Sequence, residues 1–275
     1  MTDIELKAIK SIQLEMMDEI HKICVRNGIT YYMIAGTLLG AVRHGGFIPW
    51  DVDVDIAMPR EDYERFEVLC KAELSDQYRY LDYHQVQNYV HPHALVSHKG
   101  TRLNGKYDRV NPAVMGVGVY IDIFPLDNAP NDPELRKKQA QELVLIRKFK
   151  GKRLMYCYSF SRVRRVVHYA VATLLSWIPV QKINAYQQRI MQQYREQETV
   201  CLCSMASRYK YDKQCMPKDV YGHPVLLDFE NRRYYAPAKY TEYLTRLYGD
   251  YMRLPPEEDR QSNLEIFDSL VFLTQ

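Results

Sequence analysis

An alternation of acidic and apolar residues around Asp53 constrains the fold of this chain more than any other feature. The alternation predicts a strand from Val52 to Met58, because successive side chains of a β-strand point to opposite faces. Such a strand places the carboxylates of Asp51, Asp53 and Asp55 on one face. Aspartate is a poor strand former and like charges repel, so the arrangement is costly unless a cation lies between the carboxylates. The alternative is an exposed edge strand with an acidic outer face.

The three carboxylates are therefore predicted to hold a divalent ion. Hard oxygen ligands on one rigid strand suit Mg²⁺ or Mn²⁺, and they leave coordination positions open for the phosphate of a substrate. Two ions on shared carboxylates can clamp the attacking and leaving oxygens of an in-line phosphoryl displacement. The acidic strand thus favours phosphodiester chemistry.

A glycine and a hydroxyl residue, Gly36 and Thr37, stand where a strand is predicted to turn into a helix. The strand covers 29–35, which is rich in β-branched and aromatic residues, and the helix continues through Val42. A glycine at such a turn lets phosphate oxygens approach the backbone amides of a helix N-terminus. Thr37 also fits an ordinary helix cap, and it is the acidic strand downstream that favours a phosphate site here.

Two further segments complete the predicted catalytic region. Apolar residues at helical spacing predict an amphipathic helix over 6–25, which Gly28 ends. A second acidic strand is predicted over 119–127. Within it Asp122 is a candidate third carboxylate, which would bind metal or accept the proton of an attacking hydroxyl. Asp127 fits either a similar role or a cap of the following turn.

The run from Tyr31 to Phe66, with AGTLLGAVRHGGFIPWDVDVD at its centre, resembles the signature of the LicD family, which fukutin and fukutin-related proteins share more loosely. The segment 119–127 is similar to the family's second acidic strand, and 221–256 resembles its C-terminal part. The resemblance implies an α/β (α+β) fold of the polymerase-β-like nucleotidyltransferase type. Its mixed sheet would carry a helical insertion and a C-terminal extension.

The resemblance also implies an activity. Members are associated with moving phosphocholine or a similar alcohol phosphate from a CDP-activated donor such as CDP-choline. The acceptor is a hydroxyl of a cell-surface glycan, such as lipopolysaccharide or teichoic acid, or its lipid-linked precursor. By this resemblance the catalytic residues are Asp53, Asp55 and Asp122, the ligands of Mg²⁺ or Mn²⁺ are these three and Asp51, and Gly36 and Thr37 meet the donor phosphates.

Basic contacts to the donor are predicted from Arg43 and Lys99. Relatives often carry Lys and Arg where Leu95 and Ser97 stand in this chain, so a nearby cation is expected to replace that contact. A guanidinium pairs well with phosphate oxygens, which favours Arg43.

Cysteines and histidines offer two other places for a metal. Cys201, Cys203 and Cys215 lie in one short region that suits a zinc cage, but they lack the usual CxxC spacing. Buried, reduced thiols are the favoured interpretation. His44 is expected to pack beside Trp50. Histidines without tight ligand spacing are expected to be scattered over the surface, namely His84, His91, His93 and His98.

A helical subdomain is predicted after Pro130. Asp132-Pro133 is a start signal for a long helix near 135–155. The stretch 147–165 carries eight cations and no acid, and the apolar run 166–180 follows it. That run is shorter than the ~20 residues that span a bilayer. The stretch is therefore either a solvated basic face beside a buried helix or a surface that rests on an anionic membrane.

The net charge and the N-terminal residues limit which partners and which cellular location the sequence predicts. The net charge of +3 is small for 275 residues and no nucleic-acid module is present, so nucleic acid is not an expected partner. The first residues lack a secretory signal, which favours the cytoplasm, peripheral to the inner face of the plasma membrane. We expect a catalytic core over 1–130, a helical subdomain over 131–200 and a C-terminal segment over 201–275 that packs on the core.

Two alternatives to the LicD-type transferase stay open on the sequence. One is a nucleotidyltransferase that uses a nucleoside triphosphate on a small-molecule acceptor. The other is a non-catalytic nucleotide-binding protein on the same fold, which would require vestigial carboxylates.

Overall fold

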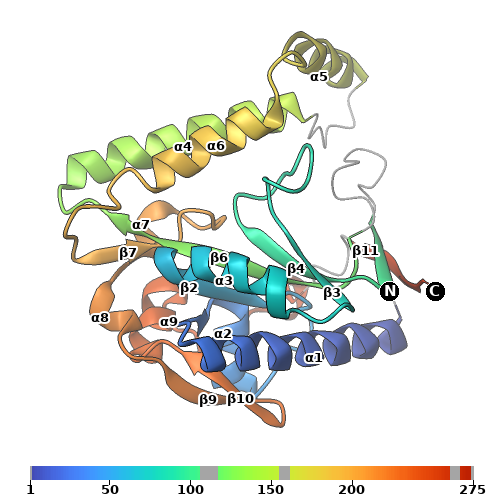
Figure 1. The fold of residues 1–275 in the computed structure, drawn as a ribbon, viewed down its shortest axis with the longest axis vertical. Helices are drawn as coiled ribbons and strands as arrows, with labels where there is room; N and C mark the ends of the chain where they lie inside the picture. The colour runs from blue at the N-terminus through green and yellow to red at the C-terminus, as the bar shows by residue number, and fades with distance from the viewer. Residues whose placement is uncertain (1, 106–116, 155–161, 261–266, 274–275) are drawn as a thin grey trace.

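A mixed sheet forms the centre of the computed structural model, which describes residues 2–105, 117–154, 162–260 and 267–273 (Figure 1). Strands β2 and β6 are parallel, and the other neighbours in this sheet are antiparallel. The α+β class with a mixed sheet is therefore confirmed. The order of the strands is β1 (Tyr32–Met33), β2 (Asp55–Pro59), β6 (Tyr120–Ala129), β4 (Ala94–His98) and β3 (Tyr78–Leu81).

The C-terminal part of the chain extends this sheet. Strand β7 (Cys201–Cys203) pairs with the end of β6, and β8 (Cys215–Pro217) pairs with β7. Residues that follow the helical segment thus share backbone hydrogen bonds with the strand that carries Asp122. The domain boundaries at 130 and 200 stay a prediction.

Two helices cover one face of the sheet. Helix α1 (Asp3–Asn27) packs on β4 and β6, and α3 (Arg60–Glu73) packs on β2 and β6. The buried stripe of α1 includes Met16 and Ile20, at the spacing that an amphipathic helix requires. Gly28 ends the helix in the left-handed conformation, with φ of 61°, as predicted.

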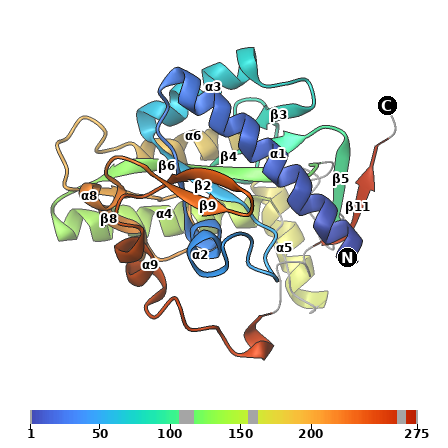
Figure 2. The same cartoon turned by 90° about the horizontal axis from the view of Figure 1, so that it is seen from below.

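Helix α2 (Ala35–His44) packs against a second layer from the C-terminal part of the chain, seen from below in Figure 2. That layer consists of the hairpin of β9 (Val225–Phe229) with β10 (Arg232–Ala236), and of helix α9 (Tyr240–Tyr248). The short helices α7 (Tyr211–Gln214) and α8 (Lys218–Tyr221) lead into it. The C-terminal segment therefore lies against the turn that precedes the acidic strand.

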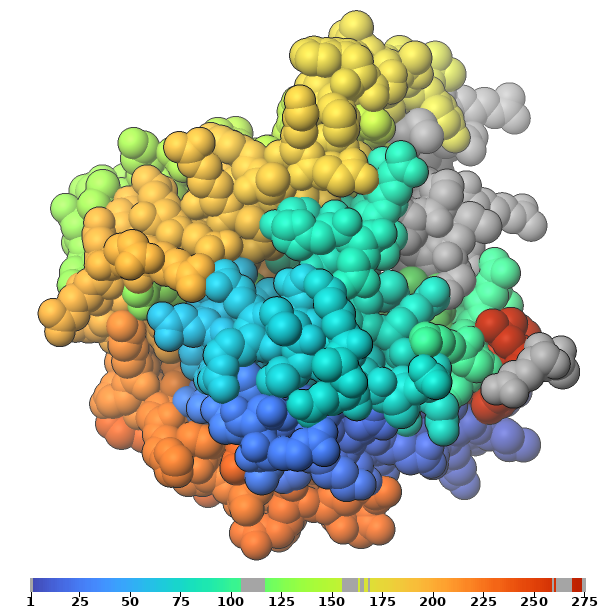
Figure 3. Space-filling view, viewed as in Figure 1, coloured from blue at the N-terminus to red at the C-terminus, as the bar shows by residue number. Residues whose placement is uncertain are grey.

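The predicted helical segment is a hairpin of α4 (Pro133–Arg153) and α6 (Val180–Met191), with α5 (Arg162–Leu174) at one end. Asp132 caps α4 by accepting hydrogen bonds from the amides of Glu134 and Leu135, which confirms the predicted start. Figures 1 and 3 show α5 projecting from the body of the molecule. The remaining described elements are β5 (Thr101–Gly105), its partner β11 (Phe267–Phe272) and a 3₁₀ turn (Glu257–Asp259).

Strands β1 and β2 are shorter than the sequence predicts. The amide of Asp53 donates to Asp51 Oδ1 at 3.3 Å, and the amide of Asp55 donates to Thr37 Oγ1 at 2.8 Å. These backbone groups therefore bond to side chains rather than to a neighbouring strand. Ala35 has a positive φ of 47°, which turns the chain out of β1 and into α2.

Candidate active site

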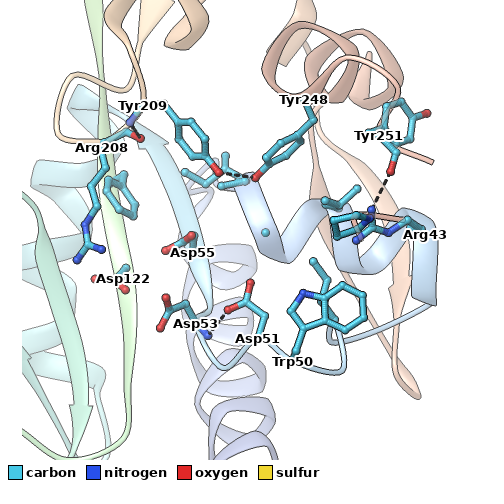
Figure 4. Close-up of a pocket in the computed structure, with 18 of the residues that line it drawn as sticks. Arg43, Trp50, Asp51, Asp53, Asp55, Asp122, Arg208, Tyr209, Tyr248 and Tyr251 are labelled. Carbon is cyan, nitrogen blue, oxygen red and sulfur yellow. Dashed lines mark hydrogen bonds between the residues drawn. The ribbon is translucent and has the colours of Figure 1, made fainter. Parts of the chain in front are cut away.

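A cleft of about 1530 Å³ opens at the start of β2, and it is lined by the four carboxylates of Asp51, Asp53, Asp55 and Asp122 and, from the C-terminal part of the chain, by Asp250. Asp55 begins β2 and is the register partner of Asp122 on the parallel strand β6. Asp51 and Asp53 come from the extended segment before β2, where the apolar residues between them are buried. Figure 4 shows the four carboxylates gathered on one side of the cleft. The predicted acidic face therefore exists, on an extended segment and on two strands.

The crowding of these carboxylates has an electrostatic cost. Burial raises the pKa of Asp55 well above its ordinary value, and the neighbouring Asp122, Asp53 and Asp51 raise it further. Arg208 opposes this shift. Ionised carboxylates in such a position gain from a multivalent cation, and a donor set made only of carboxylate oxygens suits Mg²⁺ or Mn²⁺. The donor chemistry of these carboxylates therefore suits the predicted divalent ion, although among the described residues no three of them bring their oxygens close enough together to share one ion.

The two residues assigned to donor phosphates both lie in the first turn of α2, but their side chains have different surroundings. Gly36 lines the cleft, and a Cβ at this position would lie 2.8 Å from Asp51 Oδ2, so only glycine leaves the carboxylate in place. Thr37 is 3% exposed and lies outside the cleft lining. Its hydroxyl accepts from the amide of Asp55 and thereby fixes the start of the acidic strand.

The two basic residues assigned to the donor lie in different places. Arg43 lines the cleft, and its Nη1 donates to the carbonyl oxygen of Tyr251 at 3.0 Å. Burial lowers the pKa of Arg43, as does the nearby Arg260, while Tyr248 opposes them. Lys99 is exposed in the turn between β4 and β5 and is not part of the cleft lining.

A further wall of the cleft comes from the C-terminal part of the chain, and its residues were not predicted from the sequence. Arg208 and Tyr209 follow β7, and Tyr248 ends α9. The hydroxyls of Tyr209 and Tyr248 are 3.0 Å apart, and the guanidinium of Arg260 lies 5.6 Å from the centre of the Trp50 ring. Arginines clustered with tyrosines near the end of the chain were the available signal. The cleft is large enough for two ligands at once.

Two histidines also belong to the cleft, which overturns their assignment to the surface. His93 is buried, and its Nε2 lies 2.6 Å from Asp122 Oδ1. His91 lines the cleft beside it, and burial together with His93 lowers its pKa to about 3. The His-x-His spacing directly before a strand was the signal. His84 is exposed and His98 half-buried, and neither lines the cleft.

His44 packs edge-on against Trp50, with ring centres 5.9 Å apart, as expected. Asp127 proves to be no cap. It is buried in β6 and accepts two hydrogen bonds of 2.7 Å from the guanidinium of Arg60.

The cysteines assigned to an alternative zinc cage lie in β7 and β8. Cys201, Cys203 and Cys215 are buried, and burial raises the pKa of Cys215 to about 12. Cys157 lies outside the described residues. Over the described ranges, the one group of metal-binding side chains close enough to share an ion through single ligand atoms is His91, His93 and Asp122.

The sequence of this chain is similar to those of known proteins. A family model described as "LicD/FKTN/FKRP, nucleotidyltransferase domain" matches residues 28–142. The lipopolysaccharide cholinephosphotransferase LicD of Haemophilus influenzae is 30% identical over 267 residues, which are 95% of this chain and 96% of that protein. The human ribitol 5-phosphate transferase FKRP is 50% identical over 46 residues, which are 17% of this chain and 9% of that protein.

Proposed function

Because this chain belongs to the LicD family and is a LicD-type phosphotransferase, we propose that it transfers an alcohol phosphate from a CDP-activated donor to a hydroxyl of a glycan. The relatives named for cholinephosphate and ribitol 5-phosphate transfer support an alcohol phosphate as the transferred group. The single observation that carries the proposal is the pairing of Asp55 with Asp122 across parallel strands. It brings carboxylates that lie far apart in the sequence to one point in a cleft.

The proposed cofactor is Mg²⁺ or Mn²⁺, held by Asp53, Asp55 and Asp122 with Asp51 beside them. When bound, the ion supplies positive charge that offsets the charge developing on the phosphate oxygens. The chain's own residues bind and orient the reactants. Gly36 keeps the N-terminus of α2 open to phosphate oxygens, and Arg208 presents a guanidinium on the side of the cleft where Asp122 lies. The acceptor hydroxyl then attacks in line and displaces CMP.

The donor is tested by thermal unfolding in the presence of candidate ligands. We expect one of CDP-choline, CDP-ethanolamine, CDP-ribitol and CDP-glycerol to stabilise the protein only when Mg²⁺ is present. A ligand at about a hundredfold its dissociation constant adds about 2.7 kcal/mol to the free energy of unfolding. For a chain of this size that raises the melting temperature by several degrees, at roughly 2–4 °C per kcal/mol.

The same measurement on the Asp53→Asn variant is the control, because the stabilisation should be lost with the metal ligand. Stabilisation by a nucleoside triphosphate alone would favour nucleotidyl transfer to a small molecule instead. Stabilisation by a CDP-alcohol that is equal in the variant and independent of Mg²⁺ would favour a non-catalytic nucleotide-binding protein.

For a glycan on a lipid carrier, we propose that α5 rests on an anionic membrane at the inner face of the plasma membrane. None of the helices in the described ranges is long and apolar enough to cross a bilayer. Val166, Leu174 and Trp177 are nevertheless 67%, 73% and 77% exposed, on the projecting α5 and directly after it. Lys148 and Lys152 are exposed near the end of α4 that leads to α5. Apolar side chains beside cations are typical of an interfacial surface.

Membrane contact is tested by sedimentation with vesicles. We expect the protein to bind vesicles that contain phosphatidylserine, and replacing Val166, Leu174 and Trp177 by serine should weaken binding at least about tenfold. Val68→Ser is the matched control, because Val68 is 66% exposed on α3, a helix that covers the sheet. Equal binding by the triple variant and the wild type would exclude α5 as the contact.

A further inference from the structure

The loop that carries His91 and His93 is fastened from outside the sheet by helix α6. Asn184 Nδ2 donates to the carbonyl oxygen of Tyr89 at 2.9 Å, and Gln188 Nε2 donates to that of Pro92 at 2.8 Å. The hydroxyl of Tyr89 in turn donates to the carbonyl oxygen of His93 at 2.9 Å. The backbone on both sides of His91 is therefore fixed by buried side chains.

A buried lysine supports this arrangement. Lys150 Nζ donates to Asn184 Oδ1 at 3.0 Å and to Gln187 Oε1 at 2.8 Å, and among the described residues no carboxylate forms an ion pair with it. Burial lowers the pKa of Lys150 to about 7, because the charged form of the amine loses its hydration in the interior. Lys150, Asn184 and Gln187 do not line the cleft. The effect of this network is to hold the histidine loop in one conformation.

The histidines converge on Asp122. One ligand atom each from His91, His93 and Asp122 can be chosen so that all three lie within 4.8 Å of one another. Two ligands of one ion are at most about 4.2 Å apart at metal–nitrogen distances of about 2.1 Å, so a small closure is enough to enclose an ion. His93 Nδ1 is buried and has no hydrogen-bond partner among the described residues. Because His93 approaches Asp122 through Nε2, it is Nε2 that faces the shared ion position, and the unpartnered Nδ1 lies on the other side of the ring.

We propose that His91, His93 and Asp122 bind a divalent transition-metal ion of the imidazole-binding class, with Zn²⁺ as the reference ion. Imidazole nitrogen favours Zn²⁺ and its neighbours in the first transition series, whereas Mg²⁺ prefers oxygen ligands and keeps its water. Two histidines and one carboxylate leave coordination positions open to a substrate oxygen. The site therefore differs in ligand chemistry from the proposed all-carboxylate site of Asp51, Asp53, Asp55 and Asp122, with which it shares Asp122.

Asp122 joins the two sites, because it is also the register partner of Asp55. Any role of this second ion in phosphate transfer rests on the proposed function. The binding of the ion to the protein does not. The competing explanation is that the histidines only orient Asp122 through the 2.6 Å contact with His93 Nε2. That explanation predicts no selective affinity for Zn²⁺.

The test is calorimetric titration of the full chain with Zn²⁺ in excess Mg²⁺. We expect one Zn²⁺ per chain, and His91→Gln and His93→Gln should each weaken its binding by about 100-fold or more. His84→Gln is the matched control, since His84 is an exposed histidine of the same loop. Unchanged affinity in both cleft variants would overturn the proposal. So would a loss of binding only when Cys201, Cys203 and Cys215 are replaced by serine.

Co²⁺ bound to the wild type gives a readout that needs no variant. Weak visible bands without an intense thiolate charge-transfer band are expected for histidine and carboxylate ligands, and an intense thiolate band would contradict the site. Asp53→Asn separates this inference from the proposed function, because it should keep the Zn²⁺ affinity while it loses transfer. Zn²⁺ binding without transfer of any CDP-alcohol by the wild type would refute the function and leave the metal site standing.

Discussion

Replacing Asp55 with asparagine is expected to reduce the transfer rate by on the order of 10³-fold or more, which corresponds to about 4 kcal/mol of transition-state stabilisation. Asparagine keeps the shape of the side chain and the hydrogen bond from the backbone amide to Thr37, so the fold should persist. It removes the negative charge that the proposed divalent ion requires. Initial rates with the donor identified by thermal unfolding measure the loss.

Stability should change in the opposite direction from activity. The raised pKa of Asp55 means that its ionised form is disfavoured in the folded protein, so a neutral side chain relieves a cost at neutral pH. Without added metal, Asp55→Asn should unfold at the same temperature as the wild type or a higher one. Asp228→Asn, which removes an exposed carboxylate of β9, is the control and should keep full activity. Near-normal turnover by Asp55→Asn would refute the assignment.

Asp127→Ala is expected to lower the free energy of unfolding by about 3–5 kcal/mol, the largest stability effect that we predict. Asp127 is 1% exposed and Arg60 7%, and two parallel hydrogen bonds join them. Alanine leaves the guanidinium enclosed between α3 and β6 without its counter-charge. Urea unfolding followed by circular dichroism measures the change.

The double variant Arg60→Met with Asp127→Ala should recover most of this loss, because an apolar pair avoids the cost of enclosing an unpaired charge. Asp219→Ala breaks the exposed ion pair with Lys239 and should leave the unfolding midpoint almost unchanged. An Asp127→Ala variant as stable as the wild type would show that Arg60 reaches water or another acceptor when Asp127 is removed.

The sequence predicted the acidic face because that signal is local. Burial alternates through 51–56 as a strand pattern requires, although β2 begins only at Asp55. Before it, Val54 accepts a hydrogen bond from the amide of Asp122 on β6, whereas the amides of Asp53 and Asp55 donate to side-chain oxygens of Asp51 and Thr37. A pattern of alternating polarity reports which face is buried. It does not report whether a second strand lies alongside.

Contacts between distant segments could not be predicted in this way. Arg43 was assigned to phosphate from its neighbourhood in the sequence, yet it also donates to Tyr251 in the C-terminal segment. His91 and His93 carry no periodic pattern, and only the pairing of β4 with β6 brings their loop to Asp122. The position of Thr37 in the sequence is typical of a phosphate-binding turn, but its hydroxyl accepts a hydrogen bond from the backbone amide of Asp55.

The residues that line the cleft are synthesised in a fixed order, because they lie in separate parts of the chain. The four carboxylates proposed to bind the divalent ion have been made once the ribosome reaches position 122, whereas the C-terminal wall of the cleft runs from Ala206 to Arg260. A nascent chain therefore contains all the proposed divalent-ion ligands before it can enclose a donor. Strand β7 must also pair with β6, which is made some 70 residues earlier, and such long-range pairing is slow. Activity should consequently appear only after nearly the whole chain has left the ribosome, so a stalled or shortened product is expected to be inert.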